Sequence, residues 1–505
     1  MKKTVFIKNA AILTATSLLL RFAGIIFKVW LSGAIGSEGI GLYQLVFSVY
    51  VLASTFATSG ISTAVTRLCA EEIAKETPKN CKRILNRAVW LCLTVAVFSA
   101  ALIIFGADFI GKNILGDARA VPSLKILPLS LPFMAFSSCL RGYFIARRRV
   151  LSNSIGQIFE QAVRILFVVL FIKMSVKKGL AACCFGIILG DAVAEAFGFL
   201  LLYLSYIVDK RNLKSTKNNT TTGIFRKILH ITVPITSGRY LNSLLRTGEN
   251  VLVPKNLAKY HLSGANALSQ FGMIKGMALP LLFFPSAILN SVSTLLIPEI
   301  SEAVTNKNRH TIKSASEKII KLTLLCGILC GVLFFFGGEK IGVLIYHDSD
   351  VGFLLKALSP IVPLMYLDSI CDGILKGLDQ QSFTFKTAIS DSASRIVLVL
   401  LLLPKMGIKG FILIMYFSNL LTCLLNVGRL IKISGAKIKI FSDLLLPLLS
   451  AITVSMVSNT ILKLINLQNN LVYIMFLVGT SCLLYIGVLY YLEIIPKRTV
   501  KTLVK

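Results

Sequence analysis

Four cations stand inside long apolar stretches of this sequence, where positive charge is costly. Arg21 and Lys28 are seven residues apart, and so are Arg239 and Arg246. Seven residues fall only about 20° short of two helical turns, so each pair shares one helix face. A cation at bilayer depth costs at least about 2.5–3.5 kcal/mol, which disfavours contact with lipid. We therefore expect these side chains, with Lys275, to line a water-filled, anion-binding cavity; snorkelling or pairing with carboxylates is the alternative for each.

Two pairs of opposite charge lie four residues apart on predicted helices. Glu160 precedes Arg164, and Asp391 precedes Arg395. At this spacing the two side chains meet on the helix surface, so each pair neutralises itself. A structural role is the simpler interpretation. The other is a gate whose ion pairs break and re-form between conformations.

Further carboxylates lie one helical turn apart. Asp368 and Asp372 share one face, and Asp191 and Glu195 share another. Acidic residues inside a membrane can bind Na⁺ or H⁺, so the first pair is the stronger candidate for ion coupling. Helix capping or solvation in a cavity would explain both pairs otherwise.

Motifs that signal catalysis or a bound cofactor do not occur. There is no G-x-x-x-x-G-K-[ST] loop and no H-E-x-x-H motif. Most of the eleven cysteines lie in apolar stretches, and Cys326 and Cys330 have no further partners to complete a zinc site. We expect neither an enzyme nor a resident metal or cofactor. A gradient of Na⁺ or H⁺, the membrane potential or the substrate gradient would drive any transport.

The elements that must position these residues are transmembrane helices. Hydrophobic residues make up 55% of the 505 residues and charged residues only 15%. Apolar runs of about 20 residues, long enough to cross a hydrocarbon core of about 30 Å, recur along the whole chain. We predict an all-α integral membrane protein of about fourteen spans: 10–31, 40–66, 88–107, 122–143, 155–173, 179–206, 227–250, 269–297, 319–338, 353–377, 387–403, 410–428, 443–464 and 471–492.

Positive charge is unevenly distributed between the two sides of this predicted topology. The net charge is +31, which in a soluble protein would suggest nucleic acid as a partner. With the N-terminus inside, the inner segments carry 35 Lys and Arg residues and the outer loops carry 12. This bias predicts that both termini are cytoplasmic and that the inner face meets anionic lipid head groups. No nucleic-acid partner is expected.

The two halves of the sequence are related by an internal repeat. Residues 132–180 align without a gap to residues 363–411, at an offset of 231, with 12 identities that include Arg164 and Arg395. Upstream, an offset of 218 matches Arg21 to Arg239. An even number of helices separates the equivalents, so we expect parallel repeats with the substrate between them. The predicted division is a lobe at 1–206, a linker at 207–226, a second lobe at 227–430, and two further helices with a cytoplasmic tail at 431–505.

Several short motifs resemble one family, the polysaccharide-transporter branch of the MATE-like flippase superfamily. They occur in order between residues 20 and 400. The motifs are Gly36-x-x-Gly39-x-Gly41-Leu42-Tyr43-Gln44-Leu45, Ser59-Gly60-Ile61-Ser62-x-Ala64-Val65-x-Arg67, Arg141-Gly142-Tyr143-Phe144, Gln157-x-x-Glu160-Gln161-x-x-Arg164, Gly276-Met277-Ala278-Leu279-Pro280 and Leu296-Ile297-Pro298-Glu299-Ile300-Ser301.

This resemblance implies a specific cargo and cycle. The family fold has two six-helix lobes plus two helices, around a cavity that opens alternately to each side. The implied cargo is an undecaprenyl-pyrophosphate-linked peptidoglycan precursor for the spore cortex, moved across the bacterial cytoplasmic membrane. Relatives hold the pyrophosphate with cations of the first and eighth helices, which here carry Arg21, Lys28 and Lys275. The alternatives are export of another polyprenyl-linked sugar, or a membrane scaffold that recruits cell-wall synthesis enzymes.

Overall fold

The computed structural model describes residues 3–58, 60–75, 77, 79–211, 223–260, 263–290, 308–464 and 469–494. Every regular element within these ranges is a helix, and none is a β-strand. This confirms the expected all-α fold, which follows because a backbone in lipid must satisfy its hydrogen bonds within its own segment. The contacts divide the chain into two compact units, Met1–Gly272 and Met273–Lys505.

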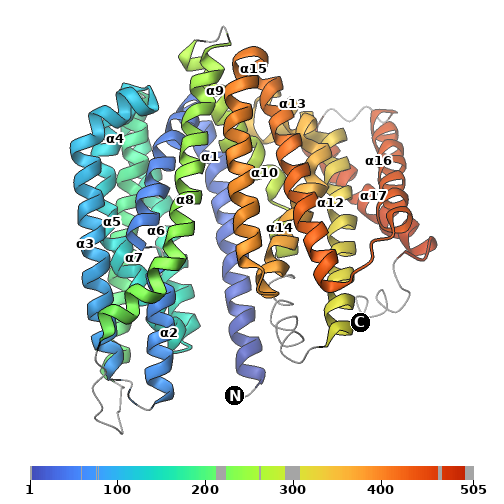
Figure 1. Ribbon diagram of the computed structural model, residues 1–505. Helices are drawn as coiled ribbons and strands as arrows, with labels where there is room; N and C mark the ends of the chain where they lie inside the picture. The colour runs from blue at the N-terminus through green and yellow to red at the C-terminus, as the bar shows by residue number, and fades with distance from the viewer. Residues whose placement is uncertain are drawn as a thin grey trace. The chain divides into compact units, whose positions relative to one another are not determined.

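The first unit contains the candidate site and is built mainly from long helices (Figure 1). A π-helical turn, Ile110–Leu115, extends α3, and short 3₁₀ turns connect some of the others. The helices are α1 (Lys3–Thr58), α2 (Ile61–Ala74), α3 (Asn80–Phe109), α4 (Val121–Ile126), α5 (Leu131–Ala146), α6 (Val150–Ser175), α7 (Leu180–Arg211), α8 (Ile224–Ala258) and α9 (Gly264–Gly272).

The second unit begins with a π-helical turn, Met273–Ala278, and a second π-helical turn, Ile440–Leu445, precedes α16. Tyr473 of α17 packs with Leu462 and Leu477 in a hydrophobic cluster that joins α16 to α17. The described helices are α10 (Leu279–Phe283), α12 (Arg309–Tyr346), α13 (Ser349–Leu358), α14 (Val362–Gly377), α15 (Gln381–Ser434), α16 (Leu446–Leu464) and α17 (Asn470–Tyr491).

Ten helical stretches of the described chain are long and apolar enough to cross a membrane. Two of them, Ala11–Ala74 and Gln381–Ser434, each carry two predicted spans and are interrupted at Gly36 and Gly407, which have positive φ. Glycine suits these breaks because it has no Cβ to oppose such a conformation. The predicted spans 227–250 and 269–297 are not among the ten, so the number fourteen stays a prediction.

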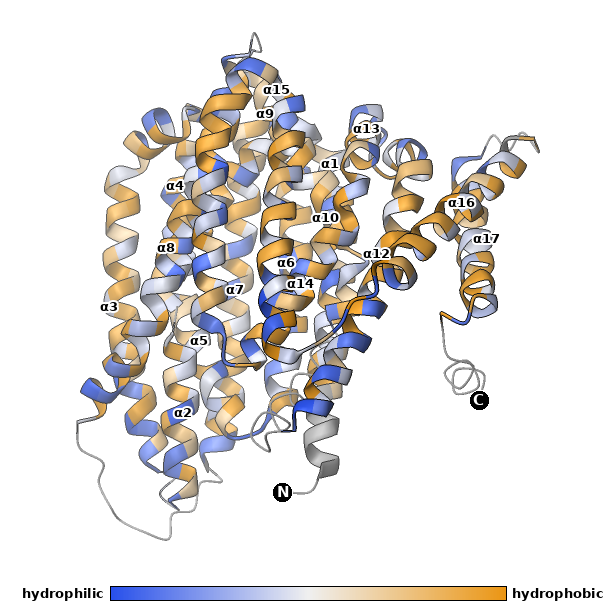
Figure 2. Cartoon of the chain, turned by 45° about the vertical axis from the view of Figure 1, so that its right-hand side comes forward, coloured by the Kyte–Doolittle hydropathy of each residue, from blue (hydrophilic) through white to orange (hydrophobic). Residues whose placement is uncertain are grey.

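Apolar side chains cover the outer surface of individual helices, as α3 illustrates. Figure 2 shows hydrophobic residues along much of α3. Phe105 is 89% exposed and Trp90 is 68% exposed on this helix. Soluble proteins rarely expose large contiguous apolar patches, whereas lipid is a favourable environment for them. The chain is therefore a multi-pass membrane protein.

The internal repeat is visible in the boundaries of the helices. Helix α5 begins at Leu131 and α14 begins at Val362, and they end at Ala146 and Gly377. Both boundaries are separated by the offset of 231 residues that the sequence alignment predicts. Helices α6 and α15 also begin 231 residues apart. The aligned halves therefore fold into the same local succession of helices.

Connections before and after these helices repeat as well. Asp117 and Asp348 are both N-caps, and each accepts a backbone hydrogen bond in the first helical turn that follows. Arg148 and Asp379 both have φ of 59°, although neither is glycine. A non-glycine residue in this conformation is uncommon, so its occurrence at equivalent places supports common turn geometry.

Close packing at glycine brings together the helices that form the candidate site. A Cβ atom at Gly142 of α5 would lie 2.6 Å from the backbone oxygen of Ser62 in α2. A Cβ atom at Gly190 of α7 would lie 2.6 Å from a methyl group of Val168 in α6. Only a residue without a side chain allows these approaches, which hold α2 against α5 and α6 against α7.

The predicted lobes are defined by the sequence repeat, whereas the two compact units are defined by contacts between residues, and the two divisions differ. The compact unit that ends at Gly272 includes α8 and α9, which the repeat assigns to the second lobe. The predicted boundaries therefore stay a prediction. Residues 212–222 of the linker, residues 495–505 of the tail and the motif from Leu296 to Ser301 lie outside the described residues.

Candidate functional site

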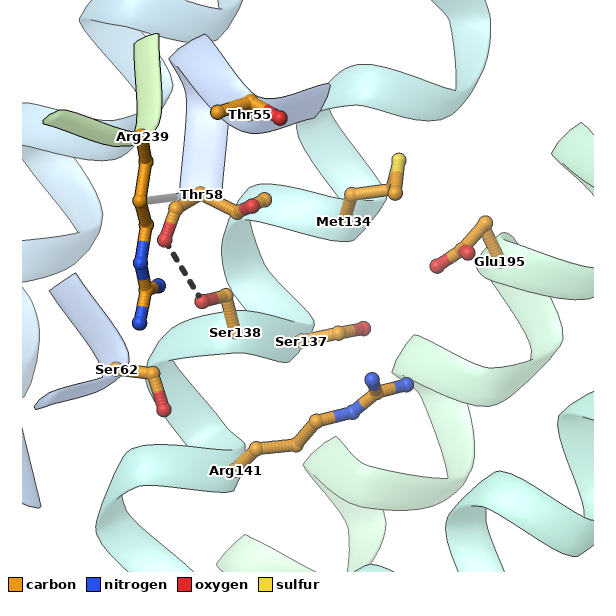
Figure 3. Close-up of a pocket in the computed structure, with 9 residues that line it drawn as sticks. All are labelled: Thr55, Thr58, Ser62, Met134, Ser137, Ser138, Arg141, Glu195 and Arg239. Atoms are coloured by element: carbon orange, nitrogen blue, oxygen red, sulfur yellow. Dashed lines mark hydrogen bonds between the residues drawn. The ribbon is translucent and has the colours of Figure 1, made fainter. Parts of the chain in front are cut away.

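A polar pocket of about 350 Å³ lies within the first unit (Figure 3). Five helices, α1, α2, α5, α7 and α8, contribute to its wall. Five hydroxyl groups, one thioether, two guanidinium groups and one carboxylate line it: Thr55, Thr58, Ser62, Ser137, Ser138, Met134, Arg141, Arg239 and Glu195. The side chains therefore offer both donors and acceptors, and two cations against one anion.

Arg239 reaches this pocket from α8 and is exposed. Figure 3 shows its guanidinium group on the same side of the pocket as Ser62 and Ser138. Within the part of the chain that the structure describes, Arg239 has no hydrogen bond or ion pair. Its planar group of five N–H donors is thus available to a ligand that can accept two parallel hydrogen bonds.

The hydroxyl groups of the pocket are of two kinds. Thr55 and Thr58 donate to backbone carbonyl groups one turn earlier on α1, at 2.7 and 2.8 Å, so their oxygen atoms remain available as acceptors. Ser138 donates to the Thr58 carbonyl at 3.4 Å. Ser137 is 2% exposed, and its Oγ has no partner among the described residues. A buried hydroxyl without a partner is costly, so a ligand at Ser137 would be favoured.

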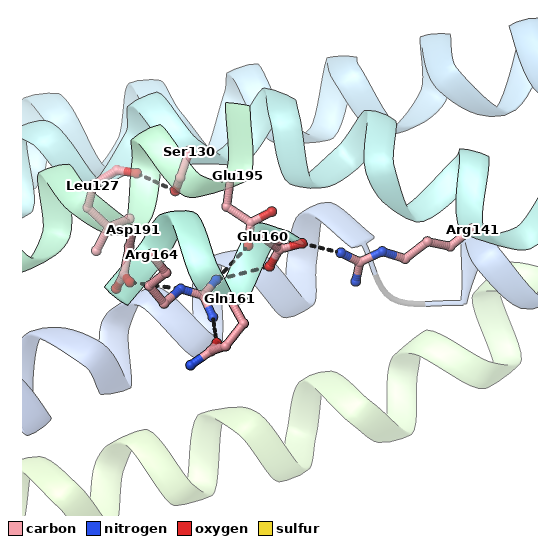
Figure 4. Close-up of polar contacts among 8 residues, drawn as sticks. All are labelled: Leu127, Ser130, Arg141, Glu160, Gln161, Arg164, Asp191 and Glu195. Carbon is pink, nitrogen blue, oxygen red and sulfur yellow. Dashed lines mark hydrogen bonds and ion pairs between the residues drawn. The ribbon is translucent and has the colours of Figure 1, made fainter. Parts of the chain in front are cut away.

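A cluster of buried charges lies beside the pocket (Figure 4). Arg164 on α6 binds three carboxylates: Glu160 at 3.0 Å, Asp191 at 3.0 Å and Glu195 at 3.3 Å. Arg141 on α5 binds the other oxygen of Glu160 at 2.5 Å. The predicted pair of Glu160 and Arg164 is confirmed, and the pair of Asp191 and Glu195 belongs to the same cluster.

The carboxylates outnumber the cations in this cluster. Three carboxylates face two guanidinium groups, which leaves one net negative charge if all are ionised. The side chains of Glu160, Asp191 and Glu195 are only 11%, 6% and 7% exposed. Charges this far from water are retained only when they are paired, so each guanidinium has an essential electrostatic role.

The other predicted cations of the first unit do not line the pocket. Arg21 is exposed and Lys28 is half-buried, both on α1 before the break at Gly36. Arg246 is exposed on α8 and donates to Asn242 Oδ1 at 3.2 Å. Of the four cations on these two helices that the sequence singles out, the structure places Arg239 alone at the pocket.

Lys275 belongs to the second unit. It is half-buried in the π-helical turn Met273–Ala278, with its Nζ 5.9 Å from the centre of the Phe411 ring. A cation over an aromatic face gains modest electrostatic stabilisation. Its predicted role in anion binding stays a prediction.

The predicted ion pair of the second unit is present. Arg395 Nη2 lies 3.3 Å from Asp391, four residues earlier on α15, and Ser418 donates to the same carboxylate at 2.5 Å. This pair is equivalent to Glu160 and Arg164 in the repeat. Its role as a gate stays a prediction.

The two candidate ion-coupling carboxylates have different partners. Asp372 pairs with Lys376 at 2.5 Å on the exposed end of α14. Asp368 instead accepts a hydrogen bond from the Asn426 amide at 2.8 Å and is half-buried. Because an amide does not neutralise a carboxylate, Asp368 is the better placed of the two to attract a cation.

Sequence reasoning missed Arg141 as a site residue and missed one buried cluster. Asp209 of α7 is fully buried and binds Tyr143 at 2.6 Å, Arg147 at 3.2 Å and Arg149 at 2.8 Å. Hydrogen bonding to Asp209 raises the pKa of Arg147, which therefore stays charged. The arginine run at 147–149 was the available signal, but nothing in the sequence indicated Asp209 as its partner.

Metal binding finds no support in the part of the chain described. No group of three or more His, Cys, Asp or Glu side chains there has an arrangement that could hold a metal ion. All eleven cysteines are free thiols, and eight of them are buried. They behave as small apolar residues of the helix interfaces.

Comparison with known proteins assigns the family. Residues 6–304, more than half of the chain, match the family described as polysaccharide biosynthesis protein. The chain belongs to this family. It is 28% identical over 449 residues to stage V sporulation protein B of Bacillus subtilis (strain 168), covering 87% of this chain and 86% of that protein. It is 23% identical over 453 residues to the lipid II flippase MurJ of the same organism, covering 84% and 82%.

Solved structures show the same fold. A lipid II flippase MurJ in an inward closed conformation matches with a TM-score of 0.72 and 16% identity, over 95% of this chain and 99% of that one. An outward-facing multidrug MATE family transporter of the MOP superfamily matches with a TM-score of 0.57 and 14% identity, over 85% and 96%. At these identities the matches concern the fold, and they confirm the MATE-like fold that the motifs predicted.

Proposed function

We propose that this family member is a flippase that moves an anionic lipid-linked oligosaccharide across the membrane. One observation carries the proposal: Arg239 lines a polar pocket of a multi-pass membrane protein and has no ion pair among the described residues. A guanidinium group in such a place is compensated by water or by an anionic ligand. Its fork geometry suits phosphate oxygens, and the hydroxyl groups around it suit sugars.

The family and its members support this choice among transporters. The family description concerns polysaccharide biosynthesis, and one relative is named as a flippase of lipid II. Export of cationic drugs by this pocket is disfavoured, because Arg239, which has no ion pair among the described residues, repels a cation. An anionic carrier lipid with a saccharide head satisfies both the charge and the hydroxyl groups.

For the cargo itself, we propose an undecaprenyl-pyrophosphate-linked peptidoglycan precursor, used for the spore cortex. The similarity to stage V sporulation protein B over most of both chains supports this assignment. The bias of Lys and Arg towards one side supports a cytoplasmic location for both termini in a bacterial cytoplasmic membrane. Coupling to Na⁺, H⁺ or the membrane potential, and recruitment of cell-wall enzymes, belong to the same proposal.

Reconstitution into proteoliposomes tests the proposal. Fluorescent undecaprenyl-pyrophosphate-linked peptidoglycan precursor and a second polyprenyl-linked sugar are placed in separate vesicles, and a membrane-impermeant quencher reports the leaflet of each. The expected result is movement of the peptidoglycan precursor faster than in vesicles without protein. Movement of the second sugar alone would overturn the cargo assignment. Movement of neither would overturn the flippase function and favour the scaffold.

A further inference from the structure

Arg141 belongs to the pocket and to the buried ion cluster at the same time. It lines the pocket on α5, while its Nη2 binds Glu160 of α6 at 2.5 Å. Glu195 has the same double position, since it lines the pocket and binds Arg164 at 3.3 Å. Both charged groups that face Arg239 across the pocket are thus held by residues outside it. A ligand can bind them fully only by competing with those partners.

The pocket contains polar atoms that remain without partners while Arg141 holds Glu160. The Nε of Arg141 is buried and has no hydrogen-bond partner among the described residues. The same is true of Ser137 Oγ, four residues earlier on the same helix and 2% exposed. Both atoms lie on residues that line the pocket. Two unsatisfied donors beside an exposed guanidinium group favour an oxyanion with several acceptor atoms.

We propose that Arg141 is a second oxyanion ligand, which exchanges the Glu160 carboxylate for the diphosphate of the cargo. The identity of the anion rests on the proposed function. In the free state Glu160 holds Arg141, and in the bound state the diphosphate lies between Arg141 and Arg239 with Ser137 as a further donor. Glu160 then keeps Arg164 as its partner, at 3.0 Å.

The remaining charges of the site make this exchange reversible. When Arg141 turns to the cargo, Arg164 alone faces Glu160, Asp191 and Glu195. Tyr43 and Tyr50 of α1 and Cys184 of α7 are the other titratable side chains among the described residues that interact with this group, and none is a cation. The excess negative charge therefore opposes binding and draws Arg141 back after release. A carrier that must release its cargo needs such an opposing force.

The second unit has no equivalent of this arrangement. The repeat places Asp372 at the position of Arg141, so the charge is reversed there. Extending the same offset of 231 beyond the aligned residues pairs Asp191 with Thr422 and Glu195 with Asn426, so two carboxylates are absent there. The second unit has the same succession of helices without these charges, so the helix pattern does not depend on them. This difference indicates a specific role for the charges in the first unit.

Pyrophosphate binding to the purified full-length chain tests the exchange. Isothermal titration with inorganic pyrophosphate compares the natural protein in nanodiscs of zwitterionic lipid with Glu160→Gln, Arg141→Ala and the double variant. Gln cannot hold Arg141 by charge, so Glu160→Gln is expected to bind about tenfold more tightly. Arg141→Ala should bind about tenfold more weakly, and adding Glu160→Gln to it should restore nothing. Equal affinity of Glu160→Gln and the natural protein would overturn the exchange.

Two controls separate this result from general effects of charge. Asp391→Asn removes the equivalent carboxylate of the second unit, and it should leave pyrophosphate affinity unchanged. A gain in affinity with Asp391→Asn equal to that with Glu160→Gln would contradict the proposal. Thermal unfolding of each variant shows whether it is folded. If Arg141→Ala does not fold, Arg141→Lys takes its place, and it should bind more weakly because it lacks the fork.

Two further comparisons identify the source of the anion and separate a failure of the exchange from a failure of the proposed function. When phosphatidylglycerol replaces the zwitterionic lipid, Glu160→Gln should still bind pyrophosphate more tightly than the natural protein. Loss of this gain in affinity would identify a lipid head group as the occupant and overturn the cargo exchange. If the natural protein does not flip the precursor but Glu160→Gln still binds pyrophosphate more tightly, the proposed function alone is wrong. If the natural protein flips the precursor but Glu160→Gln shows no gain in affinity, the exchange alone is wrong.

Discussion

Arg141 and Arg239 line the same pocket from α5 and α8, yet their surroundings differ. Arg141 holds the buried Glu160 at 2.5 Å, whereas Arg239 has no ion pair among the residues described. The guanidinium group of Arg141 is thus already paired with a carboxylate, whereas that of Arg239 is available to a ligand. This difference separates a residue that can bind cargo at once from one that must first release a partner, and it can be tested by substitution.

The first prediction concerns the guanidinium geometry of Arg239. Arg239→Lys should retain part of the flipping rate, because the charge remains but the planar fork that matches two phosphate oxygens is lost. Arg239→Gln, which lacks the charge, should lose more. The measurement is the initial rate of flipping in proteoliposomes at equal protein density. Equal rates for Arg239→Lys and Arg239→Gln would contradict a role in binding an anion.

The second prediction concerns stability. Arg164→Ala removes the one cation that binds Asp191 and Glu195 among the described residues, so it should lower the free energy of unfolding by about 3–5 kcal/mol. Arg67→Ala is the matched control, because Arg67 forms an exposed pair with Glu71 at 3.2 Å and should change stability by about 0.5 kcal/mol or less. Thermal or denaturant unfolding in detergent compares the two. Similar small losses for both would show that the cluster is not essential to the fold.

The third prediction concerns helix packing next to the pocket. Gly142→Ala should destabilise the first unit, because its Cβ would lie 2.6 Å from the Ser62 backbone oxygen and force α2 away from α5. Overpacking of this kind costs about 1–3 kcal/mol. Gly428→Ala in α15 has nothing within 4 Å and should be neutral or stabilising, by up to about 1 kcal/mol. A neutral Gly142→Ala would show that the two helices can separate without cost.

The fourth prediction concerns ion coupling in the second unit. If Asp368 binds a cation, Asp368→Asn should remove any dependence of transport on Na⁺ or pH. Asp372 already pairs with Lys376, so Asp372→Asn should have the smaller effect. Transport is measured in imposed Na⁺ and H⁺ gradients, with folding checked by unfolding temperature. Unchanged ion dependence in both variants would exclude this helix face as the coupling site.

Much of the fold could be predicted because it depends on local pattern. Apolar runs predict spans, and ion pairs four residues apart, such as Glu160 and Arg164, follow from helix geometry alone. The ungapped alignment of the halves also predicted that helix starts would recur 231 residues apart, as Leu131 and Val362 do.

The site could be predicted only in part because it depends on neighbours from different helices. Arg239 stood out by its charge in an apolar run, but its pocket takes residues from four other helices. Arg141 meets Glu160 from a separate helix, 19 residues earlier in the chain, and Asp209 meets Tyr143 across 66 residues. The spacing of residues within one helix does not predict such contacts between different helices. The sequence also treated Arg21 and Arg239 as equivalent, whereas the structure places only Arg239 at the pocket.

The central claim is that cations of the first unit hold the anionic group of a lipid-linked sugar. The most direct measurement is the flipping rate of undecaprenyl-pyrophosphate-linked peptidoglycan precursor by Arg141→Ala, Arg239→Ala and the double variant in proteoliposomes, because both residues line the pocket; membrane insertion is quantified for each. Arg239→Ala should lower the rate about 10-fold to 100-fold, as loss of a hydrogen-bonded charge predicts, and the double variant should flip no faster than either single variant. Insertion should be unchanged, because removing a charge from a membrane helix does not hinder it. Full transport by the double variant would contradict the claim.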